Sequence, residues 1–263
     1  MSCIALGTVQ FGMNYGVSNK TGQVSVSEVE KILDFCRNNG INILDTAQGY
    51  GESEKVLSRF DLRSFKIVTK LIGEARLEDS LENLKAEHIY ALMFHRENEC
   101  NDSSWKIYEG YKNQGLVSKI GVSVYTPEIL KKILERYPIE IVQLPMNILD
   151  QRFVPYLSEL KEKGIEIHVR SSFLQGLLLM DSVPEYFNPI KDILSAIPYP
   201  RLEHSLNFVR KQKIDNIVVG VTRLKDLVEI KEAYSSDLSG YNYEEFALND
   251  EKYVNPANWR LVK

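Results

Sequence analysis

The sequence predicts a single (β/α)8 barrel, the TIM-barrel architecture, with parallel strands and mostly short loops at its mouth. Apolar, β-rich segments alternate with amphipathic segments almost to the end of the chain, and eight such units can be counted. The length of 263 residues is typical of this fold. An open, doubly wound sheet normally has a glycine-rich turn after its first strand, and residues 7–16 match that pattern poorly. We therefore expect one barrel domain over residues 1–263.

The expected strands are short apolar runs bounded by turn and helix signals. They cover residues 4–8, 41–45, 66–70, 89–94, 118–123, 140–144, 165–170 and 216–220. The tail at 240–263 is rich in Tyr and Asn and is expected to pack on the barrel, at either its top or its bottom.

The first long helix is expected within residues 25–40. Ser27 and Glu30 have the spacing of a capping box, and Gly40 is a natural stop. The apolar residues that repeat at helical spacing are Val29, Ile32, Leu33 and Cys36.

A second helix has the same signals in the segment TPEILKKILERYP. Thr126 is the expected N-cap, Pro127 suits the first helical position, and Pro138 closes the segment. Gly115 and Gly164 are likewise expected to end helices that run into strands.

The composition argues against several classes of protein. A hydrophobic content of 44% and a charged content of 26% indicate an ordinary packed core. The net charge is −4, and the 32 basic residues are scattered among 36 acidic ones, so no nucleic-acid partner is expected. No window approaches the roughly 20 apolar residues that cross a bilayer, and no base precedes Lys20, as a cleaved signal peptide would require.

The cysteines and histidines give no sign of a disulfide framework or a metal site. Cys3, Cys36 and Cys100 are odd in number and widely spaced, which is typical of reduced thiols in a cytoplasmic protein. The four histidines lack the spacing of metal ligands, so no metal is expected. The oligomeric state is not indicated by the sequence.

Four polar residues lie at or just after the ends of three consecutive expected strands. Asp45, Lys70 and His95 end apolar runs at steps of 25 residues, and Tyr50 follows the first of them. Because the carboxyl ends of parallel strands meet at one rim, we expect these side chains to lie together. An acid, a phenol, an amine and an imidazole at one place indicate a proton-transfer site. Taken singly, Asp45, Tyr50 and His95 are more typical of a helix cap, an interface or loop aromatic and a core histidine, and Lys70 is equally typical of a structural ion pair.

The segment DTAQGYGESE, followed by VTK and MFH, resembles the aldo-keto reductase family, whose active site is an Asp-Tyr-Lys-His tetrad. The resemblance runs from about Leu6 to Glu229 and covers most of the chain. It implies NADPH-dependent reduction of an aldehyde, a ketone or a sugar carbonyl to the alcohol. Segments that resemble the family's first strand, seventh-strand segment and cofactor-phosphate loop are GTVQFG at 7–12, SSFLQGLLL at 171–179 and VVGVTRLKDLVE at 218–229.

Carbonyl reduction gives each member of the tetrad a role. Tyr50 is the candidate acid, and its ordinary pKa of about 10 is too high for work near neutrality. A neighbouring ammonium favours phenolate, so we expect Lys70 to lower that pKa. Asp45 would pair with Lys70 and compensate its buried charge. His95 would donate to the substrate oxygen beside Tyr50.

The resemblance also implies a nucleotide site, because no side chain of the tetrad can carry hydride. It implies NADP over NAD, since Arg offers a planar fork for phosphate and the next helix is expected to present free N–H groups. By resemblance the nicotinamide carboxamide is bound by Ser123 and Gln143, the pyrophosphate by Ser171, Leu174, Gln175 and Gly176, the 2′-phosphate by Gly220, Thr222, Arg223 and Lys225, and the adenine by Glu229. The alternative for Gln143 is hydrogen bonding to backbone groups at the barrel rim, and the alternative for Arg223 and Lys225 is ordinary surface charge.

Two residues depart from the family pattern, and the substrate is not specified. Val124 and Ile230 stand where the family usually has Asn, which removes contacts to the carboxamide and the adenine. Arg96 could meet an acidic substrate group, although pairing with a nearby glutamate is the stronger expectation. The positions expected to line the substrate pocket are Phe11, Tyr15, Arg96, Met146, Asn147 and Phe173.

Two other functions remain open at this point. The same barrel could hold NADP as a regulatory or sensor subunit with little turnover. It could also be a Schiff-base lyase with Lys70 as the nucleophile, although such a lysine should lie away from a carboxylate such as Asp45.

Overall fold

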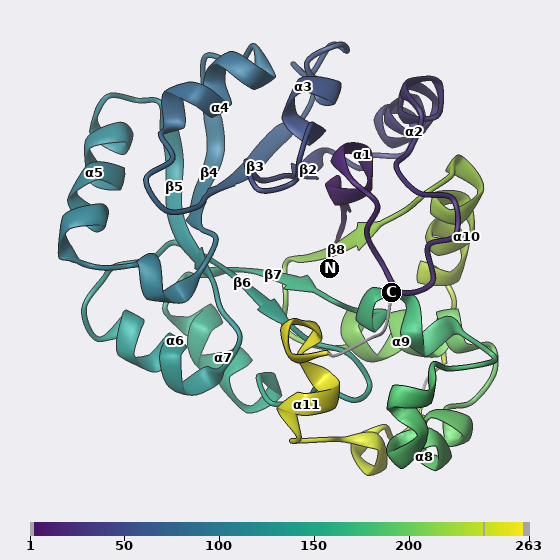
Figure 1. Cartoon of the computed structure of the whole chain (residues 1–263). Coiled ribbons are helices and arrows are strands. Elements are labelled where there is room, and N and C mark those ends of the chain that lie inside the picture. The colour runs from purple at the N-terminus through teal and green to yellow at the C-terminus, as the bar shows by residue number, and fades with distance from the viewer. Residues whose placement is uncertain (1–2, 239, 260–263) are drawn as a thin grey trace.

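A computed structural model describes residues 3–238 and 240–259. Eight parallel strands, paired in chain order, close into a barrel, and β8 returns to pair with β1 (Figure 1). The predicted (β/α)8 fold is thus confirmed, with each strand within two residues of its expected bounds. The strands are β1 Cys3–Gly7, β2 Ile43–Asp45, β3 Lys66–Leu71, β4 Ile89–Phe94, β5 Val117–Ser123, β6 Ile141–Pro145, β7 Glu166–Arg170 and β8 Asn216–Gly220.

Helices surround the strands on the outside of the barrel (Figure 1). The α-helices are α1 Val9–Gly12, α2 Val26–Asn38, α3 Ser53–Leu57, α4 Leu77–Leu84, α5 Asp102–Asn113, α6 Pro127–Leu134, α7 Leu157–Glu162, α8 Lys191–Ala196, α9 Arg201–Arg210, α10 Leu224–Tyr234 and α11 Glu251–Val254. The 3₁₀ helices are η1 Glu97–Glu99, η2 Val154–Tyr156, η3 Leu174–Leu179, η4 Glu185–Ile190, η5 Glu244–Phe246 and η6 Pro256–Asn258.

The start of α2 differs from the prediction. Its N-cap is Ser25, whose hydroxyl accepts from the Glu28 N–H, so the capping box expected for Ser27 and Glu30 is wrong. Ser27 lies inside the first turn, where its hydroxyl meets that of Ser25 at 3.2 Å. The N–H of Ile41 donates to the Cys36 carbonyl, and β2 therefore begins two residues later than expected.

The other helix signals agree with the structure. Thr126 caps α6 by accepting from the Ile129 N–H, and Pro127 occupies the first helical position. Gly40, Gly115 and Gly164 have φ of +70°, +75° and +73°. This left-handed backbone lets the chain leave a helix and enter the next strand.

The barrel interior explains where the polar residues lie. Six small or apolar side chains form an interior cluster, and they are Ala5, Ile43, Val68, Ala91, Met93 and Ile141. Successive side chains of a strand point to opposite faces, so residues two positions further along point the same way. Asp45, Lys70, His95 and Gln143 stand in that relation to Ile43, Val68, Met93 and Ile141. They therefore form a polar layer above the apolar one, at the carboxyl ends of the strands.

The C-terminal segment contacts the loop that follows β6. The Leu248 N–H donates to the Leu149 carbonyl at 2.8 Å, and the Gln151 amide donates to the Tyr243 carbonyl at 2.7 Å. Arg152 pairs with Glu251 at 2.8 Å. Since this loop leaves the carboxyl end of a strand, the segment packs on the mouth side of the barrel. Residues 260–263 of the expected tail lie outside the described residues.

Candidate active site

Asp45 and Lys70 form a buried ion pair at the centre of the site. Lys70 Nζ lies 2.8 Å from Asp45 Oδ1 and donates to the Thr46 carbonyl, also at 2.8 Å. Burial lowers the pKa of Lys70, and the carboxylate of Asp45 opposes that effect. Two hydrogen bonds therefore hold the amine in one place.

Gln143 fixes the other oxygen of Asp45. Its amide nitrogen donates to Asp45 Oδ2 at 2.7 Å, across the barrel from β6 to β2. The alternative for this residue was hydrogen bonding to backbone groups at the rim, whereas the bond in the structure is to the side chain of Asp45. Gln143 also lines the cavity, so the carbonyl oxygen of the same amide can accept a hydrogen bond from a ligand there.

Tyr50 lies in the turn between β2 and α3, beside both Lys70 and His95. Lys70 Nζ is 5.1 Å from the centroid of the phenol ring, and the His95 ring meets it edge-on with centroids 5.6 Å apart. Burial, followed by the charge of Asp45, raises the pKa of Tyr50. The prediction that Lys70 lowers this pKa is therefore wrong for this structure. The ammonium is paired with Asp45, and the charge of Asp45 adds to the desolvation that raises the pKa of Tyr50.

His95 follows β4, and its Nδ1 is buried without a hydrogen-bond partner among the described residues. Burial, with the charge of Lys70, lowers the pKa of His95 to about 4. The imidazole is thus neutral at pH 7, and a neutral ring has one N–H to donate.

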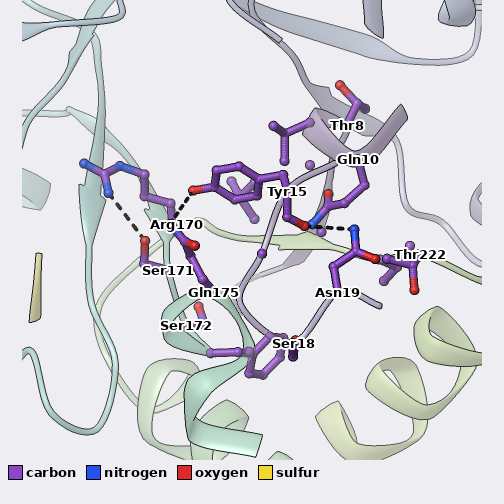
Figure 2. Close-up of a pocket in the computed structure, with 18 of the residues that line it drawn as sticks. Thr8, Gln10, Tyr15, Ser18, Asn19, Arg170, Ser171, Ser172, Gln175 and Thr222 are labelled. Carbon is purple, nitrogen blue, oxygen red and sulfur yellow. Dashed lines mark hydrogen bonds between the residues drawn. The ribbon is translucent and has the colours of Figure 1, made fainter. Parts of the chain in front are cut away.

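Three of the four tetrad residues line a cavity of about 760 Å³, and Lys70 lies behind them. Asp45, Tyr50 and His95 are at one end, while Thr222, Arg223 and Glu229 are at the other, near the start of α10. Figure 2 shows Tyr15 between Arg170 on one side and Gln10 and Thr222 on the other. The predicted residues that line the cavity are Ser123, Gln143, Ser171, Gln175, Gly176, Gly220, Thr222, Arg223 and Glu229.

Two predicted cofactor residues are placed differently. Leu174 is fully buried in the apolar core that surrounds the barrel. Lys225 is exposed and lies 3.6 Å from Glu229 on the same helix face. For Lys225 the structure agrees with the alternative of an ordinary surface charge.

The segment after β7 has an unusual backbone. Ser171, Leu174 and Gln175 have φ of +61°, +48° and +55°, and Gly176 has φ of +90°. Non-glycine residues in this region cost free energy, and such strain is concentrated at ligand sites. A Cβ on Gly176 would lie 1.9 Å from the Ser18 hydroxyl, so this glycine permits the close approach of the facing loop.

The loop at the start of α10 differs from the expectation. Asp226 accepts hydrogen bonds from the N–H groups of Thr222 and Arg223, and Glu28 accepts from the N–H of Leu224. Arg223 also pairs with Asp226 at 2.8 Å. The N–H groups expected to be free are therefore bound to carboxylates.

The cavity fits an extended nucleotide. Two buried polar atoms in its wall, Gln10 Oε1 and Ser172 Oγ, have no hydrogen-bond partner in the described part of the chain. A Cβ on Gly220 would lie 2.6 Å from Gln10 Oε1, so glycine at this position leaves room for the Gln10 side chain. Groups of three or more potential metal ligands are absent from residues 3–238 and 240–259.

The sequence reasoning missed several residues of the cavity. The loop from Met13 to Thr21, of which only Tyr15 was expected here, lies over the cavity and is tied to the Gln175 carbonyl by the N–H of Val17. Contact between segments so far apart in the chain leaves no local signal. Arg170 was also missed, although the alternation of polar residues at 166, 168 and 170 in β7 places it on the interior face.

The expected substrate positions are divided between cavity and core. Tyr15 and Phe173 line the cavity. Phe11, Met146 and Asn147 are fully buried. Arg96 is exposed, and no ion pair to a described acidic residue is found for it, so the expected pairing with Glu97 or Glu99 is wrong.

Comparisons with known proteins agree with this architecture. The model of the Aldo/keto reductase family matches residues 3–247. The uncharacterized oxidoreductase YqkF of Bacillus subtilis (strain 168) is 26% identical, over 75% of this chain and 79% of that protein.

Solved structures show the same fold. The holo form of the aldo-keto reductase AKR11C1 from Bacillus halodurans has a TM-score of 0.74 at 18% identity and covers 92% of this chain and 89% of its own. The glycerol dehydrogenase AKR11B4 from Gluconobacter oxydans has a TM-score of 0.66 at 19% identity, with coverage of 90% and 87%. In the part of this chain that the structure describes, no helix is long and apolar enough to cross a membrane.

Proposed function

This chain belongs to the aldo/keto reductase family and is an NAD(P)H-dependent oxidoreductase, and from that premise we propose that it reduces an aldehyde, ketone or sugar carbonyl. The observation that carries the proposal is that Tyr50 and His95 meet at one end of a nucleotide-sized cavity, with Lys70 directly beside the Tyr50 ring. When bound, a reduced nicotinamide nucleotide would supply the hydride. The residues of the chain would supply the proton and the electrostatic environment.

Tyr50 is the proposed proton donor. Its raised pKa keeps the hydroxyl protonated in the resting site, which is the form that an acid needs. Transfer of the proton to the substrate oxygen leaves a phenolate in a desolvated place. Lys70, with Nζ 5.1 Å from the ring centroid, lies close enough to stabilise that charge.

His95 is proposed to polarise the substrate carbonyl, and Asp45 is proposed to position the Lys70 amine. The neutral His95 ring would donate its N–H to the carbonyl oxygen and stabilise the charge that grows there. Asp45 holds the Lys70 amine through a contact of 2.8 Å. Since that amine is bound to Asp45 and to the Thr46 carbonyl, a Schiff-base role for Lys70 has no support in this geometry.

NADPH is the nucleotide that we propose, on the strength of Thr222 and Arg223 at the far end of the cavity. The 2′-phosphate would have to draw Arg223 away from Asp226. Arg223 is 60% exposed, and such surface pairs are worth only about 0–1 kcal/mol. We therefore expect NADPH to bind more tightly than NADH by no more than about tenfold.

The test is titration of the protein with each nucleotide, followed by a panel of carbonyls with Tyr50→Phe as the variant. We expect Tyr50→Phe to retain nucleotide binding and to lose at least about 100-fold in kcat, the scale of general acid catalysis. Tyr156→Phe is the control, because its hydroxyl has no hydrogen bond within the described residues. Nucleotide binding without turnover of any carbonyl would favour a sensor role instead.

A further inference from the structure

Arg170 is a charged residue at the catalytic end of the cavity to which the sequence assigned no role. It ends β7 and is half-buried. Its Nη2 donates to the Val124 carbonyl at 3.0 Å, and its Nε and Nη1 lie 3.4 Å from the hydroxyls of Ser123 and Ser171. The guanidinium carbon lies 4.3 Å from the centroid of the Tyr125 ring. Each of these partners is neutral.

The guanidinium has no carboxylate within 4.0 Å among the described residues. Nearby acids are already engaged, because Asp45 binds Lys70 and Gln143, and Glu97 accepts from the Tyr125 N–H at 2.7 Å. Three of the five N–H groups of the arginine are used, two of them in long contacts. A partly desolvated cation with free donors is a poor structural element but a good anion receptor.

The position of Arg170 identifies which anion it can meet. It lines the same cavity as Tyr50 and His95. Its charge opposes the rise that burial causes in the pKa of Tyr50, and adds to the fall that burial causes in the pKa of His95. In Figure 2 it lies across the cavity from Asn19 and Thr222, the end at which the 2′-phosphate would be bound. A group that reaches Arg170 therefore belongs near the reacting carbonyl.

We propose that Arg170 binds an acidic group, carboxylate or phosphate, carried by the carbonyl substrate. This inference rests on the proposed reductase function and adds the substrate class to it. The planar fork of the guanidinium matches two oxygens of such a group, and stacking on Tyr125 with the bond to Val124 holds the fork in one orientation. A neutral substrate of the same size would leave that cation unpaired.

Equilibrium binding tests the receptor without turnover. The protein, saturated with NADP, is titrated with benzoate and with benzamide, which differ in charge but little in shape. We expect benzoate to bind at least about tenfold more tightly, as a charge-assisted contact provides. Arg170→Gln should abolish this preference and Arg170→Lys should keep part of it. Arg63→Gln, at a side chain that is 91% exposed and remote from the cavity, should change nothing.

Turnover of 4-carboxybenzaldehyde and benzaldehyde tests the substrate class. We expect Arg170→Gln to lower kcat/KM for the acidic aldehyde by about tenfold or more and that for the neutral aldehyde by less than about threefold. Equal losses for both aldehydes, or a matching rise in the Kd of the nucleotide, would mean that Arg170 serves the cofactor or the fold, and would overturn the proposal.

Failure of the proposed function gives a different result. If neither aldehyde is reduced but benzoate is still preferred through Arg170, the reductase proposal fails and the anion receptor stands. If the wild-type protein binds benzoate and benzamide equally, the receptor is disproved whether or not the aldehydes are reduced.

Discussion

At the scale of single residues, Asp226 has two opposing effects on the nucleotide site. Its carboxylate organises the loop before α10 by accepting from the N–H groups of Thr222 and Arg223. The same negative charge neutralises Arg223 and would repel a 2′-phosphate. The choice between NADPH and NADH therefore depends on this side chain as much as on the basic residues beside it.

Asp226→Asn separates these effects, because the amide keeps an acceptor oxygen and loses the charge. We expect the Kd of NADPH to fall by about threefold to tenfold while that of NADH changes by less than about twofold. Fluorescence titration measures both constants. Asp34→Asn is a matched control, since Asp34 forms an i,i+3 pair with Arg37 on the remote surface of α2. Weaker binding of both nucleotides would show that Asp226 matters only as a cap.

The charge pattern around α10 could be only partly predicted from the sequence. Arg223 and Asp226 are three residues apart, and a capping interaction at that spacing is a local signal. Glu28, which binds the Leu224 N–H, is 196 residues away in the chain. The sequence therefore predicted free N–H groups at the start of α10. Glu28 reaches the Leu224 N–H only because closure of the barrel brings α2 beside α10.

At the scale of secondary-structure elements, one close contact positions the turn that carries Tyr50. The end of α1 packs directly on this turn, and a Cβ on Gly12 would lie 1.7 Å from the Tyr50 carbonyl oxygen and 2.4 Å from the Ser53 nitrogen. Both are backbone atoms, so the turn itself would have to move. Glycine at position 12 therefore sets where the candidate acid lies relative to Lys70 and His95.

We expect Gly12→Ala to lower kcat/KM by about tenfold to 100-fold, because displacements near 1 Å are costly in an active site. The free energy of unfolding should fall by about 1–3 kcal/mol, as in other overpacked cores. Gly110→Ala is the control: this glycine lies within α5, and no described atom comes within 4 Å of the added Cβ. The free energy of unfolding of Gly110→Ala should rise by about 0.5–1 kcal/mol, and the variant should keep full activity. Unchanged activity in Gly12→Ala would show that the turn adapts freely.

The elements were predictable to the extent that their signals are local. Apolar runs located all eight strands, and Thr126 with Pro127 located the start of α6. The tetrad was found because strand ends in a closed barrel converge. The segment after β7 was expected at the nucleotide site, but its left-handed backbone was not predicted, and of the loop that covers the cavity only Tyr15 was expected. The shapes of the two segments depend on each other through the Gln175 carbonyl.

At the scale of the whole molecule, the barrel has a reactive end and a structural end. Opposite the cavity, Glu166 of β7 accepts from Tyr90 at 2.6 Å and from Lys119 at 2.5 Å, and lies 2.7 Å from His168 Nε2. These side chains come from three strands and close the bottom of the interior. Groups at this end of such barrels generally serve stability, in contrast to those at the mouth.

The pKa of Glu166 makes this role measurable. Burial would raise the pKa, but hydrogen bonds from His168, Lys119 and Tyr90 outweigh it and lower the pKa to about 2. The folded pKa lies below the unfolded value, so the stabilising effect is complete above about pH 4.5 and is lost as the pH falls through about 2. The size of the shift corresponds to about 3 kcal/mol at neutral pH.

Glu166→Gln tests whether this network stabilises the closed barrel. At pH 7 we expect the free energy of unfolding in urea to be about 3 kcal/mol lower for the variant than for the wild type, and below about pH 2 the two values should converge. Glu159→Gln, an exposed member of a pair with Lys163, should follow the wild type at every pH. Turnover at pH 7 should be unchanged in Glu166→Gln, since the site is at the opposite end. A constant difference across the pH range would mean that shape, not charge, makes Glu166 important, and a loss of activity without a loss of stability would mean that the two ends of the barrel are coupled.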